Sequence, residues 1–404
     1  MAWVFSLCAR STSADPTALC QHFEGLNWTR ADGTLTTCEV RSFGSDVHVV
    51  PSGLSRIGLR GERDGRLFAE AAEHLYCHLK TAPPFDWALV GVEVDDERLR
   101  GEVVAACASE HFDGLVVTDS IWREAGQPDA MEPFGDRGRW RPFESIAVRV
   151  FKAPVGTQFL LGSATVIDRP GWFQVVSPGV TTHANEVMVS ELKATEDIDA
   201  RVSEVSAQYA ALDVPFKWCI GPTTAPADTT AILTRQGMSS WGMRGMYART
   251  DELDFPSPAD ADIREVRCRA DAEAFAEAGV AGWGIPLSET SRMVDLVMWG
   301  TEQPGGQWRH FVAWCGGQPV GTAGLILGGG LGYLTGASVS PAARGQGLYR
   351  ALIQRRMDEL KRLGVSLAVT QAREATSAPI LEALGFETAY RAPIFKSASP
   401  SAEV

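Results

Sequence analysis

The sequence predicts a mixed α/β (α+β) protein with more than one domain. Its 404 residues exceed the length that one hydrophobic core usually serves, so two or three domains are expected. Short apolar runs typical of strands alternate with segments whose apolar residues recur at helical spacing. The clearest example is the run Leu331–Ser338, which precedes a turn with two glycines and a helix whose apolar face carries Tyr349, Ile353, Met357 and Leu360.

Composition and charge exclude several classes of protein. Hydrophobic residues make up 45% and charged residues 22% of the chain, as in ordinary globular proteins. The net charge of −13 gives no general attraction for nucleic acid or anionic membranes, so neither is expected as a partner. No apolar run approaches the ~20 residues of a membrane helix, and no basic segment precedes the apolar start Met1–Cys8, so no secretion signal is predicted. The eight cysteines form no Cys-x-x-Cys pair, which indicates reduced thiols and a cytoplasmic protein.

The segment Val339–Tyr349 is predicted to bind a pyrophosphate. Gly345 and Gly347 lie in a tight turn between a strand and the start of a helix, where glycine lets the backbone approach a ligand closely. The first N–H groups of a helix are unpaired, and the helix dipole adds partial positive charge there. Arg344 adds a fixed positive charge. The glycine spacing matches neither a Walker A loop nor a dinucleotide fingerprint.

This turn resembles the acetyl-CoA loop of the GNAT N-acetyltransferases, R/Q-x-x-G-x-G/A. Residues Arg344–Leu348 fit that pattern, whereas Tyr349 stands where the family usually has Gly or Ala. Downstream, Leu384–Phe386 contains the Gly-Phe pair that the family often carries. The resemblance implies a GNAT-fold acyltransferase lobe with a central mixed sheet at residues 256–404, with acetyl-CoA as co-substrate. The expected cofactor-binding residues are Ser338, Val339, Arg344, Gly345, Gln346, Gly347, Leu348 and Tyr349.

The expected chemistry needs the acyl carbonyl and the amine held together, a base for the amine and an acid for the thiolate. In GNATs the strand before the loop splays from its neighbour and its free backbone groups hold the pantetheine arm; Ser338 and Val339 occupy that place. The family's usual acid is a tyrosine shortly before the Gly-Phe pair, but Leu381 stands there. Ser377, beside Thr376 at the start of the same helix, is therefore the candidate catalytic residue. A capping role for Ser377 is an equal alternative, with a helix N-terminus or a water stabilising the thiolate.

No general base and no metal site can be assigned from the sequence. The acids of the region that usually shapes the acceptor pocket are Glu289, Asp295 and Glu302. The tryptophans of that region, which could line a pocket or belong to the core, are Trp283, Trp299, Trp308 and Trp314. His74 and His78 lie one helical turn apart, but the glutamate of H-E-x-x-H is missing, so a surface pair without metal is predicted.

Residues 1–144 are predicted to form an N-terminal α/β domain that resembles no family. Its helix is expected at Leu67–Lys80, and Asp95–Glu97 is expected to be a solvated turn. The stretch Ala125–Pro142, rich in Gly, Pro and charge, is interpreted as a loop that leads into a linker. The expected strands are Trp3–Leu7, Val47–Val50, Trp87–Val94 and Gly114–Val117.

Residues 145–255 are predicted to form a degenerate GNAT-like lobe, with a generic α/β domain as the alternative. The segment Trp218–Pro222, followed by Pro226 and Asp228, is similar to the first half of the tandem GNAT proteins common in bacteria. No Arg-x-x-Gly-x-Gly turn occurs in it, which implies that this lobe does not bind acetyl-CoA. The expected strands are Ile146–Phe151, Gln158–Leu161, Asn185–Leu192, Phe216–Ile220 and Trp241–Ala248, with helices at Asp197–Leu212 and Thr229–Gln236.

An acidic, proline-containing linker, Thr250–Asp260, precedes the last lobe. In that lobe Gly316-Gly317 is a hairpin signal, and Gly364 is expected to end the helix that follows the loop. The expected helices are Ala270–Gly279, Ser288–Trp299 and Pro379–Leu384, besides the helix after the loop. The expected strands are Ile263–Cys268, Trp308–Cys315, Gln318–Leu327, Leu331–Val339, Val365–Gln371 and one that starts at Phe386–Tyr390.

These features together predict an acetyl-CoA-dependent N-acetyltransferase of the tandem GNAT kind, acting on an amine of a small molecule, a peptide or a protein. The alternative is a non-catalytic protein that uses the GNAT scaffold to hold CoA and to recognise a protein partner; Leu381 and the missing base favour it. Two lobes in one chain can mimic the dimer of single GNAT domains, so a monomer or weak homodimer is expected. The N-terminal domain is expected to recognise a partner or the acceptor.

Overall fold

The chain divides into two compact units in the computed structural model. The first comprises Met1–Arg60 and Asp64–Arg149, and the second comprises Gly61–Arg63 and Val150–Val404. Within them, the structure describes residues 4–30, 33–54, 60–94, 98–108, 113–129, 131–157, 164–178, 185–193, 196–253 and 261–398. The predicted strand Gln158–Leu161, the predicted turn Asp95–Glu97 and residues 254–260 of the predicted linker lie outside the described residues.

The first unit is an antiparallel sheet with helices, ordered β2-β3-β4-β1-β5-β6-β8-β7. Its strands are β1 (Phe5–Ser11), β2 (Asn27–Thr29), β3 (Leu35–Phe43), β4 (Asp46–Pro51), β5 (Phe85–Val92), β6 (Leu115–Val117), β7 (Glu132–Pro133) and β8 (Arg139–Trp140). Its helices are α1 (Thr17–Phe23), α2 (Glu62–Leu79), α3 (Arg100–Ala108) and α4 (Asp119–Glu124), and α5 (Ile146–Lys152) begins at its end.

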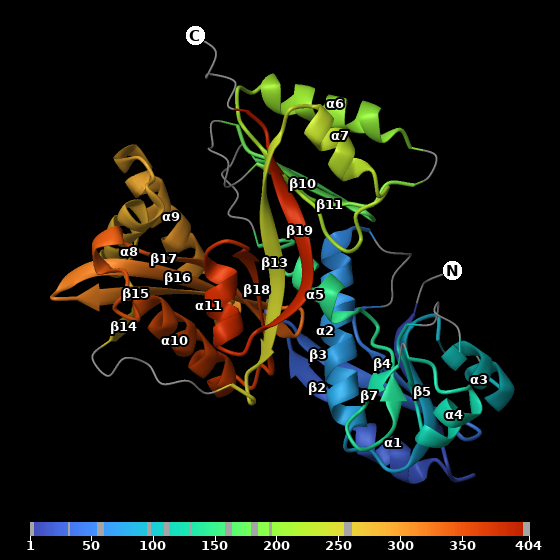
Figure 1. Cartoon of the computed structure of the whole chain (residues 1–404). Helices are drawn as coiled ribbons and strands as arrows, with labels where there is room; N and C mark the ends of the chain where they lie inside the picture. Colours follow the sequence, from blue (N-terminus) through green and yellow to red (C-terminus); the bar gives the residue numbers. More distant parts are fainter. Residues whose placement is uncertain are drawn as a thin grey trace. The chain divides into compact units, whose positions relative to one another are not determined.

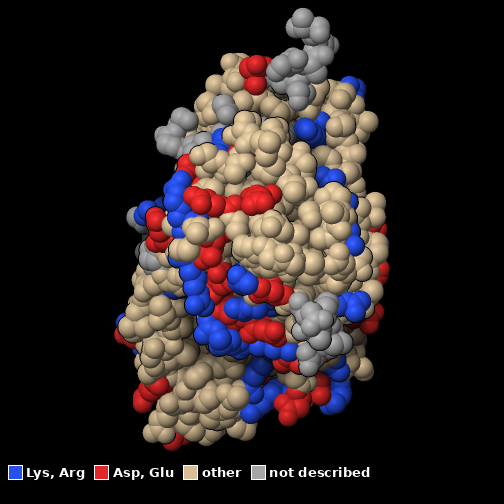
Figure 2. All heavy atoms as spheres, turned by 90° about the vertical axis from the view of Figure 1, so that its left-hand side faces the viewer, with Lys and Arg blue, Asp and Glu red and all other residues tan. Residues whose placement is uncertain are grey.

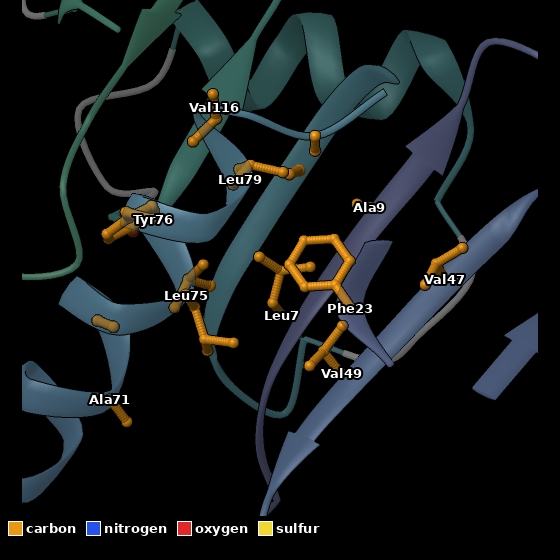
Figure 3. Packing of buried hydrophobic residues seen from close by; sticks show 14 of the residues in the cluster. Leu7, Ala9, Phe23, Val47, Val49, Ala71, Leu75, Tyr76, Leu79 and Val116 are labelled. Carbon is orange, nitrogen blue, oxygen red and sulfur yellow. The ribbon is translucent and has the colours of Figure 1, made fainter. Parts of the chain in front are cut away.

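The core of this unit forms where α2 lies on the sheet (Figure 3). Leu75 and Leu79 are one helical turn apart on α2 and are fully buried. They join Leu7 of β1, Val49 of β4 and Phe23 of α1 in a single apolar cluster. The predicted helix Leu67–Lys80 and the strands at Val47–Val50, Trp87–Val94 and Gly114–Val117 correspond to α2, β4, β5 and β6.

Two predictions for this region are wrong. The stretch Ala125–Pro142 is not only a loop, because β7 and β8 within it pair with each other and β8 pairs with β6. The predicted strand Ile146–Phe151 is the helix α5. Ser145 precedes this helix, and its Oγ accepts a hydrogen bond from Val148 N at 3.4 Å. This capping bond favours a helix over a strand for the apolar run that follows.

The second unit is built on one eleven-stranded sheet, ordered β14-β15-β16-β17-β18-β13-β19-β12-β11-β10-β9. We call its residues 150–253 the first lobe and its residues 261–398 the second lobe. The first lobe contains β9 (Thr165–Arg169), β10 (Trp172–Val176), β11 (Glu186–Ser190), α6 (Ile198–Ala210), β12 (Lys217–Cys219), α7 (Thr229–Arg235) and β13 (Ser239–Arg249). The second contains β14 (Asp262–Glu265), α8 (Arg269–Trp283), α9 (Thr290–Thr301), β15 (Trp308–Cys315), β16 (Gln318–Gly328), β17 (Leu331–Val339), α10 (Leu348–Arg362), β18 (Leu367–Arg373), α11 (Ser377–Ala383) and β19 (Glu387–Lys396).

The two lobes repeat one arrangement and exchange their last strands. In each lobe three consecutive strands pair antiparallel, β9 to β11 in the first and β15 to β17 in the second. A helix, α6 or α10, then leads to a strand that pairs parallel with the third, β12 or β18. A second helix, α7 or α11, leads to the long final strand, β13 or β19. The final strand of the first lobe, β13, pairs with β18 of the second, and β19 pairs with β12 of the first. Figure 1 shows β13 and β19 as two long strands that run side by side through the middle of the unit. The sequence boundary proposed at residue 255 stays a prediction, as does the one at 144.

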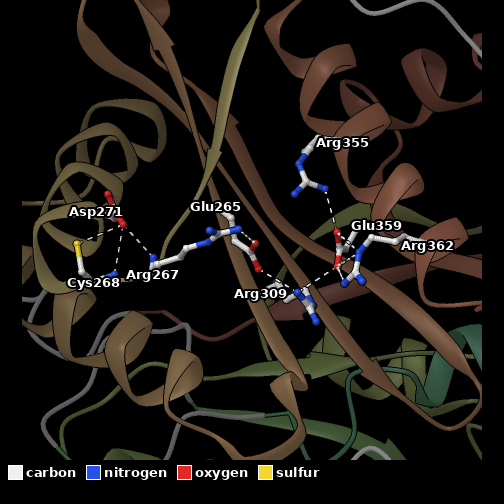
Figure 4. Close-up of polar contacts among 8 residues, drawn as sticks. All are labelled: Glu265, Arg267, Cys268, Asp271, Arg309, Arg355, Glu359 and Arg362. Carbon is white, nitrogen blue, oxygen red and sulfur yellow. Dashed lines mark hydrogen bonds and ion pairs between the residues drawn. The ribbon is translucent and has the colours of Figure 1, made fainter.

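An ion-pair network joins α10 to the strands beside it (Figure 4). The carboxylate of Glu359 in α10 is almost fully buried and contacts Arg362 at 2.5 Å, Arg355 at 3.1 Å and Arg309 of β15 at 3.0 Å. Arg309 also pairs with Glu265 of β14 at 3.0 Å. The hydrogen bonds from Arg362 and Arg355 and the charge of Arg309 lower the pKa of Glu359 to about 2. Figure 2 shows acidic and basic side chains intermingled in a band on one face of the molecule.

We predict that a fragment starting at Asp262 will aggregate. It would keep β19 but lose both strands that flank it, β13 and β12, and so expose Ile394 and Phe395, which are buried in the whole chain. Size-exclusion chromatography and thermal unfolding test this, with a fragment that starts at Val150 and keeps all eleven strands as the matched control. A monomeric Asp262 fragment as stable as the control would contradict the prediction.

We also predict that the network around Glu359 makes stability depend on acid. The folded pKa lies below the ordinary value of 4.5, so this carboxylate stabilises the fold above that value and its contribution is lost as pH falls towards about 2. Glu359→Gln is expected to lower the free energy of unfolding at pH 7 by on the order of 2 kcal/mol and to flatten its pH dependence below pH 5. Glu252→Gln, which removes an exposed pair with Arg249 at 3.8 Å, is the control and should change little. Equal effects of both substitutions on urea unfolding would refute the assignment.

Candidate functional site

The turn before α10 has the backbone geometry that an anion-binding loop needs. Gly345 and Gly347 have φ angles of +80° and +79°, in the left-handed region that only glycine adopts at little cost. Residues 344–347 are exposed, and a Cβ built on Gly345 would meet nothing within 4 Å. Arg344 donates a hydrogen bond from Nε to the carbonyl of Val339 at 3.2 Å, which ties the turn to the end of β17. The turn therefore leaves the N–H groups at the start of α10 open to solvent.

The strand before this turn separates from its neighbour. The parallel strands β17 and β18 are paired at Gly332–Ala368 and Tyr333–Val369, whereas β17 continues to Val339 and β18 to Arg373. The hydroxyl of Thr370 donates to the carbonyl of Leu334 at 2.8 Å across the point where they part. Ser338 and Val339 lie on the separated part of β17. An extended ligand can follow the backbone between the two strands there.

A buried arginine fixes the irregular part of β17. The register between β16 and β17 shifts after Thr322, and Gly336 of β17 has a φ of +55°. Arg356 of α10 is 2% exposed and donates to the carbonyls of Gly324 at 3.1 Å and Thr335 at 3.4 Å, on the two strands beside the shift. Burial lowers the pKa of Arg356 to about 10. These charge-assisted bonds hold the bulge in one conformation.

The start of α11 meets the start of α10. Ser377 accepts a hydrogen bond at Oγ from Arg373 N at 2.9 Å, so it caps the turn before α11. Burial raises the pKa of the Tyr349 phenol, while Arg356 and the nearby Ser377 hydroxyl lower it in smaller part. Tyr349 thus turns away from the glycine turn towards α11. Leu381 of α11 is 2% exposed and belongs to the apolar cluster of this lobe.

A pocket of about 460 Å³ opens beside β17 and is lined by both lobes. Of the residues proposed from the sequence, Glu289, Trp283 and Trp308 line it. Asp295 and Glu302 are not among its lining residues. The same is true of Trp299, which packs against Trp308 at 5.2 Å, and of Trp314, which lies under Arg264.

Apart from Glu289, the charged residues of the pocket and its histidine were missed by the sequence analysis. Glu186 of β11 and Lys217 of β12 form an ion pair at 2.8 Å. They are far apart in the sequence, and no motif connects them. Burial is the largest single influence on the pKa of Lys217 and lowers it, but the charge and hydrogen bond of Glu186, together with Cys219 and Tyr333, raise the pKa overall. His310 lies in the apolar strand β15, where a single polar residue among buried ones was the available signal.

Three further titratable residues of the pocket, His310, Cys219 and Tyr333, are uncharged because they are buried. Burial lowers the pKa of His310 to about 4 and raises the pKa of Cys219 and of Tyr333 to about 12. His310 packs edge-on against Phe275 at 5.3 Å, and its Nδ1 is buried with no hydrogen-bond partner among the described residues. All three side chains line the pocket. They are therefore neutral at pH 7.

The N-terminus of α6, the helix of the first lobe that corresponds to α10, is closed to anions. The Asp197 carboxylate caps α6 and accepts hydrogen bonds from the backbone N–H groups of Asp199 at 2.9 Å and Ala200 at 3.2 Å. Glu196 and Asp199 add two further acidic side chains at the same helix end. A protein carboxylate thus occupies the position where the second lobe leaves its N–H groups open.

The histidines of the first unit have other partners. The ring of His74 stacks on Trp28 at 4.6 Å, and Nε2 of His78 donates to the carbonyl of His22 at 2.9 Å. Both are half-buried, so the prediction of a surface pair is wrong in that respect. Across the described residues no cluster of three or more His, Cys, Asp or Glu side chains could hold a metal ion. Among the helices that the structure describes, none is long and apolar enough to cross a membrane.

Comparison with known proteins identifies the second lobe. Residues 281–386 match the acetyltransferase (GNAT) family. The match includes β15 to β17, the glycine turn, α10, β18 and α11. The similarity to this family is therefore established for residues 281–386, within the second lobe.

Solved structures with similarity to this chain include three acetyltransferases or related proteins. A GCN5-related N-acetyltransferase from Kribbella flavida is 16% identical, with a TM-score of 0.48, over 64% of this chain and 98% of its own. One from Sphaerobacter thermophilus is 17% identical, with a TM-score of 0.44, over 63% and 86%. A tandem GNAT protein from the clavulanic acid biosynthesis pathway is 15% identical, with a TM-score of 0.41, over 63% and 88%. No curated protein sequence matches the chain.

Proposed function

We propose that this chain is an acetyl-CoA-dependent N-acetyltransferase with its CoA site in the second lobe. The GNAT match indicates acyl transfer as the general activity. The observation that carries the specific proposal is the pair of left-handed glycines, Gly345 and Gly347, at the exposed start of α10 and directly after the splayed strand β17. The eight cysteines of the chain are free thiols, which fits a reducing compartment. We therefore propose that the protein acts in the cytoplasm.

The residues present fit the co-substrate. The N–H groups at the start of α10 and the Arg344 guanidinium would bind the pyrophosphate. Ser338 and Val339, on the part of β17 that has left β18, would hold the pantetheine arm through their backbone. Tyr349 departs from the small residue of the family pattern, but its phenol lies near Ser377 of α11, which leaves the glycine turn open. Acetyl-CoA supplies the activated acyl group.

The chain's own residues would align the two reactants. The thioester would lie near the bulge at Gly336, which also lines the acceptor pocket. Arg356 holds that bulge rigid through the carbonyls of Gly324 and Thr335, and positioning of this kind supplies much of the rate in acyl transfer. Ser377 stays the proposed donor of a proton to the thiolate, beside the N-terminus of α11.

We propose a small-molecule amine, or an amine of a peptide or protein, as acceptor, and a monomer or weak homodimer as the assembly. The pairing of β13 with β19 already joins two GNAT-like lobes in one chain. The first lobe would then act as scaffold for the second.

A second candidate function is a non-catalytic protein that holds CoA and recognises a protein partner. The observation that favours it is Leu381, buried at 2% exposure where the family's tyrosine acid usually stands. Release of free thiol from acetyl-CoA distinguishes the two candidates. Amine-dependent turnover above that of the Gly347→Glu variant would exclude the non-catalytic function.

We predict that Gly347→Glu will abolish binding of acetyl-CoA. The substitution strains a left-handed residue and puts a carboxylate at the N-terminus of α10. Isothermal calorimetry should show an affinity for acetyl-CoA at least about 100-fold lower than that of the unsubstituted protein. Gly237→Glu, at an exposed glycine with a φ of +77° and open space around it in the turn after α7, is the matched control and should bind acetyl-CoA nearly as the unaltered protein does. Equal binding by both variants would overturn the proposed site.

We further predict one CoA per chain. Asp197 already occupies the N–H groups at the start of α6, so the first lobe offers no anion site. Calorimetric titration should therefore saturate at a stoichiometry of one, and Gly347→Glu should remove the whole signal. A residual second event in that variant would show that the first lobe binds CoA as well.

A further inference from the structure

We infer that the acceptor is a small amine that is uncharged at neutral pH, such as an aromatic amine, and not an alkylammonium. This inference rests on the proposed function and names the substrate class of the same site. It is carried by the charge balance and the walls of the pocket between the two lobes.

The charged residues that line the pocket cancel in pairs. Glu186 is paired with Lys217 at 2.8 Å, and Glu289 is paired with Arg292 at 3.2 Å. Two negative and two positive side chains give the described lining a net charge of zero. His310, Cys219 and Tyr333 add no charge, since burial keeps each of them in its neutral form.

A cationic amine would therefore enter this pocket without a free counter-ion. Removing an ammonium from water is unfavourable unless a carboxylate receives it, and both carboxylates of the lining already hold a cation. A neutral amine avoids this penalty. It also carries the free electron pair that the attack requires, so it needs no base before the reaction.

The reaction balances for a neutral amine. The amine nitrogen forms a bond to the acyl carbon while the carbon–sulfur bond of the thioester breaks. One N–H proton leaves the nitrogen, and one proton is taken up by the thiolate. The products are a neutral amide and the free thiol of CoA.

The walls of the pocket suit a ring system. Trp283, Trp308, Phe275, Ile326 and Met188 supply apolar surface, and Trp308 is held in place by its edge-to-face contact with Trp299 at 5.2 Å. The volume of about 460 Å³ lies in the range of small-molecule sites. Aromatic side chains pack favourably against a flat ring. Charge and shape thus favour the same class of acceptor.

The sharpest test uses two isomers of the same formula, 4-methylaniline and benzylamine. The first is neutral at pH 7 and the second is an ammonium ion. Thiol release by the full-length protein with saturating acetyl-CoA should give a kcat/KM at pH 7 that is at least about tenfold higher for 4-methylaniline. Between pH 6 and 9 the kcat/KM should stay flat for 4-methylaniline and rise for benzylamine as its neutral fraction grows. Preference for benzylamine at pH 7 would overturn the inference.

The outcomes also separate this inference from the proposed function. Failure to bind acetyl-CoA by calorimetry would refute the proposed function itself. Binding of acetyl-CoA with turnover of polyamines or peptides, and of neither isomer, would refute the inference alone. Binding of acetyl-CoA without turnover of either isomer, of a polyamine or of a peptide would favour the non-catalytic function, and so would count against the proposed acetyltransferase activity as well as the inference.

Charge-altering variants test the cause of the preference. Lys217→Met leaves Glu186 without its cation, and should move the ratio of the two kcat/KM values at least about tenfold towards benzylamine. The double variant Glu186→Gln/Lys217→Met restores a neutral pocket and should return the original ratio. Arg292→Gln provides the same change at the half-buried pair with Glu289, so the test does not depend on the folding of a single variant. Arg235→Gln, which removes a charge at an exposed pair with Asp199 on α7 and α6, is the control and should leave the ratio unchanged. An unchanged ratio in both single variants would overturn the inference.

Discussion

The antiparallel pairing of β13 with β19 is the interaction on which the second unit depends. Each strand is the last of its own lobe, and each also pairs with a strand of the other lobe, β13 with β18 and β19 with β12. Neither lobe can therefore complete its sheet alone, because every one of these backbone ladders crosses between them. A single sheet results, in which β13 and β19 lie between the strands β17 and β18 of the second lobe and the strands β12 and β11 of the first.

This constraint explains why the pocket beside β17, the proposed acceptor site, contains residues from both lobes. The separation of β17 from β18 opens the second lobe at one end of the sheet, and the strands β11 and β12 of the first lobe bring Glu186 and Lys217 to the same pocket. The first lobe thus contributes walls and a balanced ion pair, although its own helix N-terminus is capped by Asp197. Its part in the proposed reaction is to shape the pocket and to set its charge.

Local signals in the sequence were sufficient for the loop and for most elements around it. Three features lie within the thirty-two residues Leu331–Arg362: an apolar strand, two glycines with positive φ, and an amphipathic helix. Each is predicted from residues that are close together in the sequence. The pocket could not be predicted in this way. Glu186, Lys217 and His310 come together through strand exchange and long-range packing, which leave no periodicity in the sequence. The helix α5 was missed for a different, local reason, since its apolar run suggested a strand whereas the capping bond at Ser145 favours a helix.

The two lobes differ in what surrounds the N-terminus of the helix that follows the third strand. In both, a helix starts after the third strand, and its first N–H groups need an acceptor. In the second lobe glycine turns keep those groups exposed and Arg344 adds positive charge. In the first lobe a single aspartate supplies the acceptor from within the chain, and two further acids repel any other anion. The difference requires no change in the sheet, because the backbone partners of the strands are the same on both sides of the β13·β19 pair. The choice between a capping carboxylate and a glycine turn therefore decides which lobe leaves the N–H groups at its helix start exposed, while the exchanged strands bring residues of both lobes to the pocket beside β17.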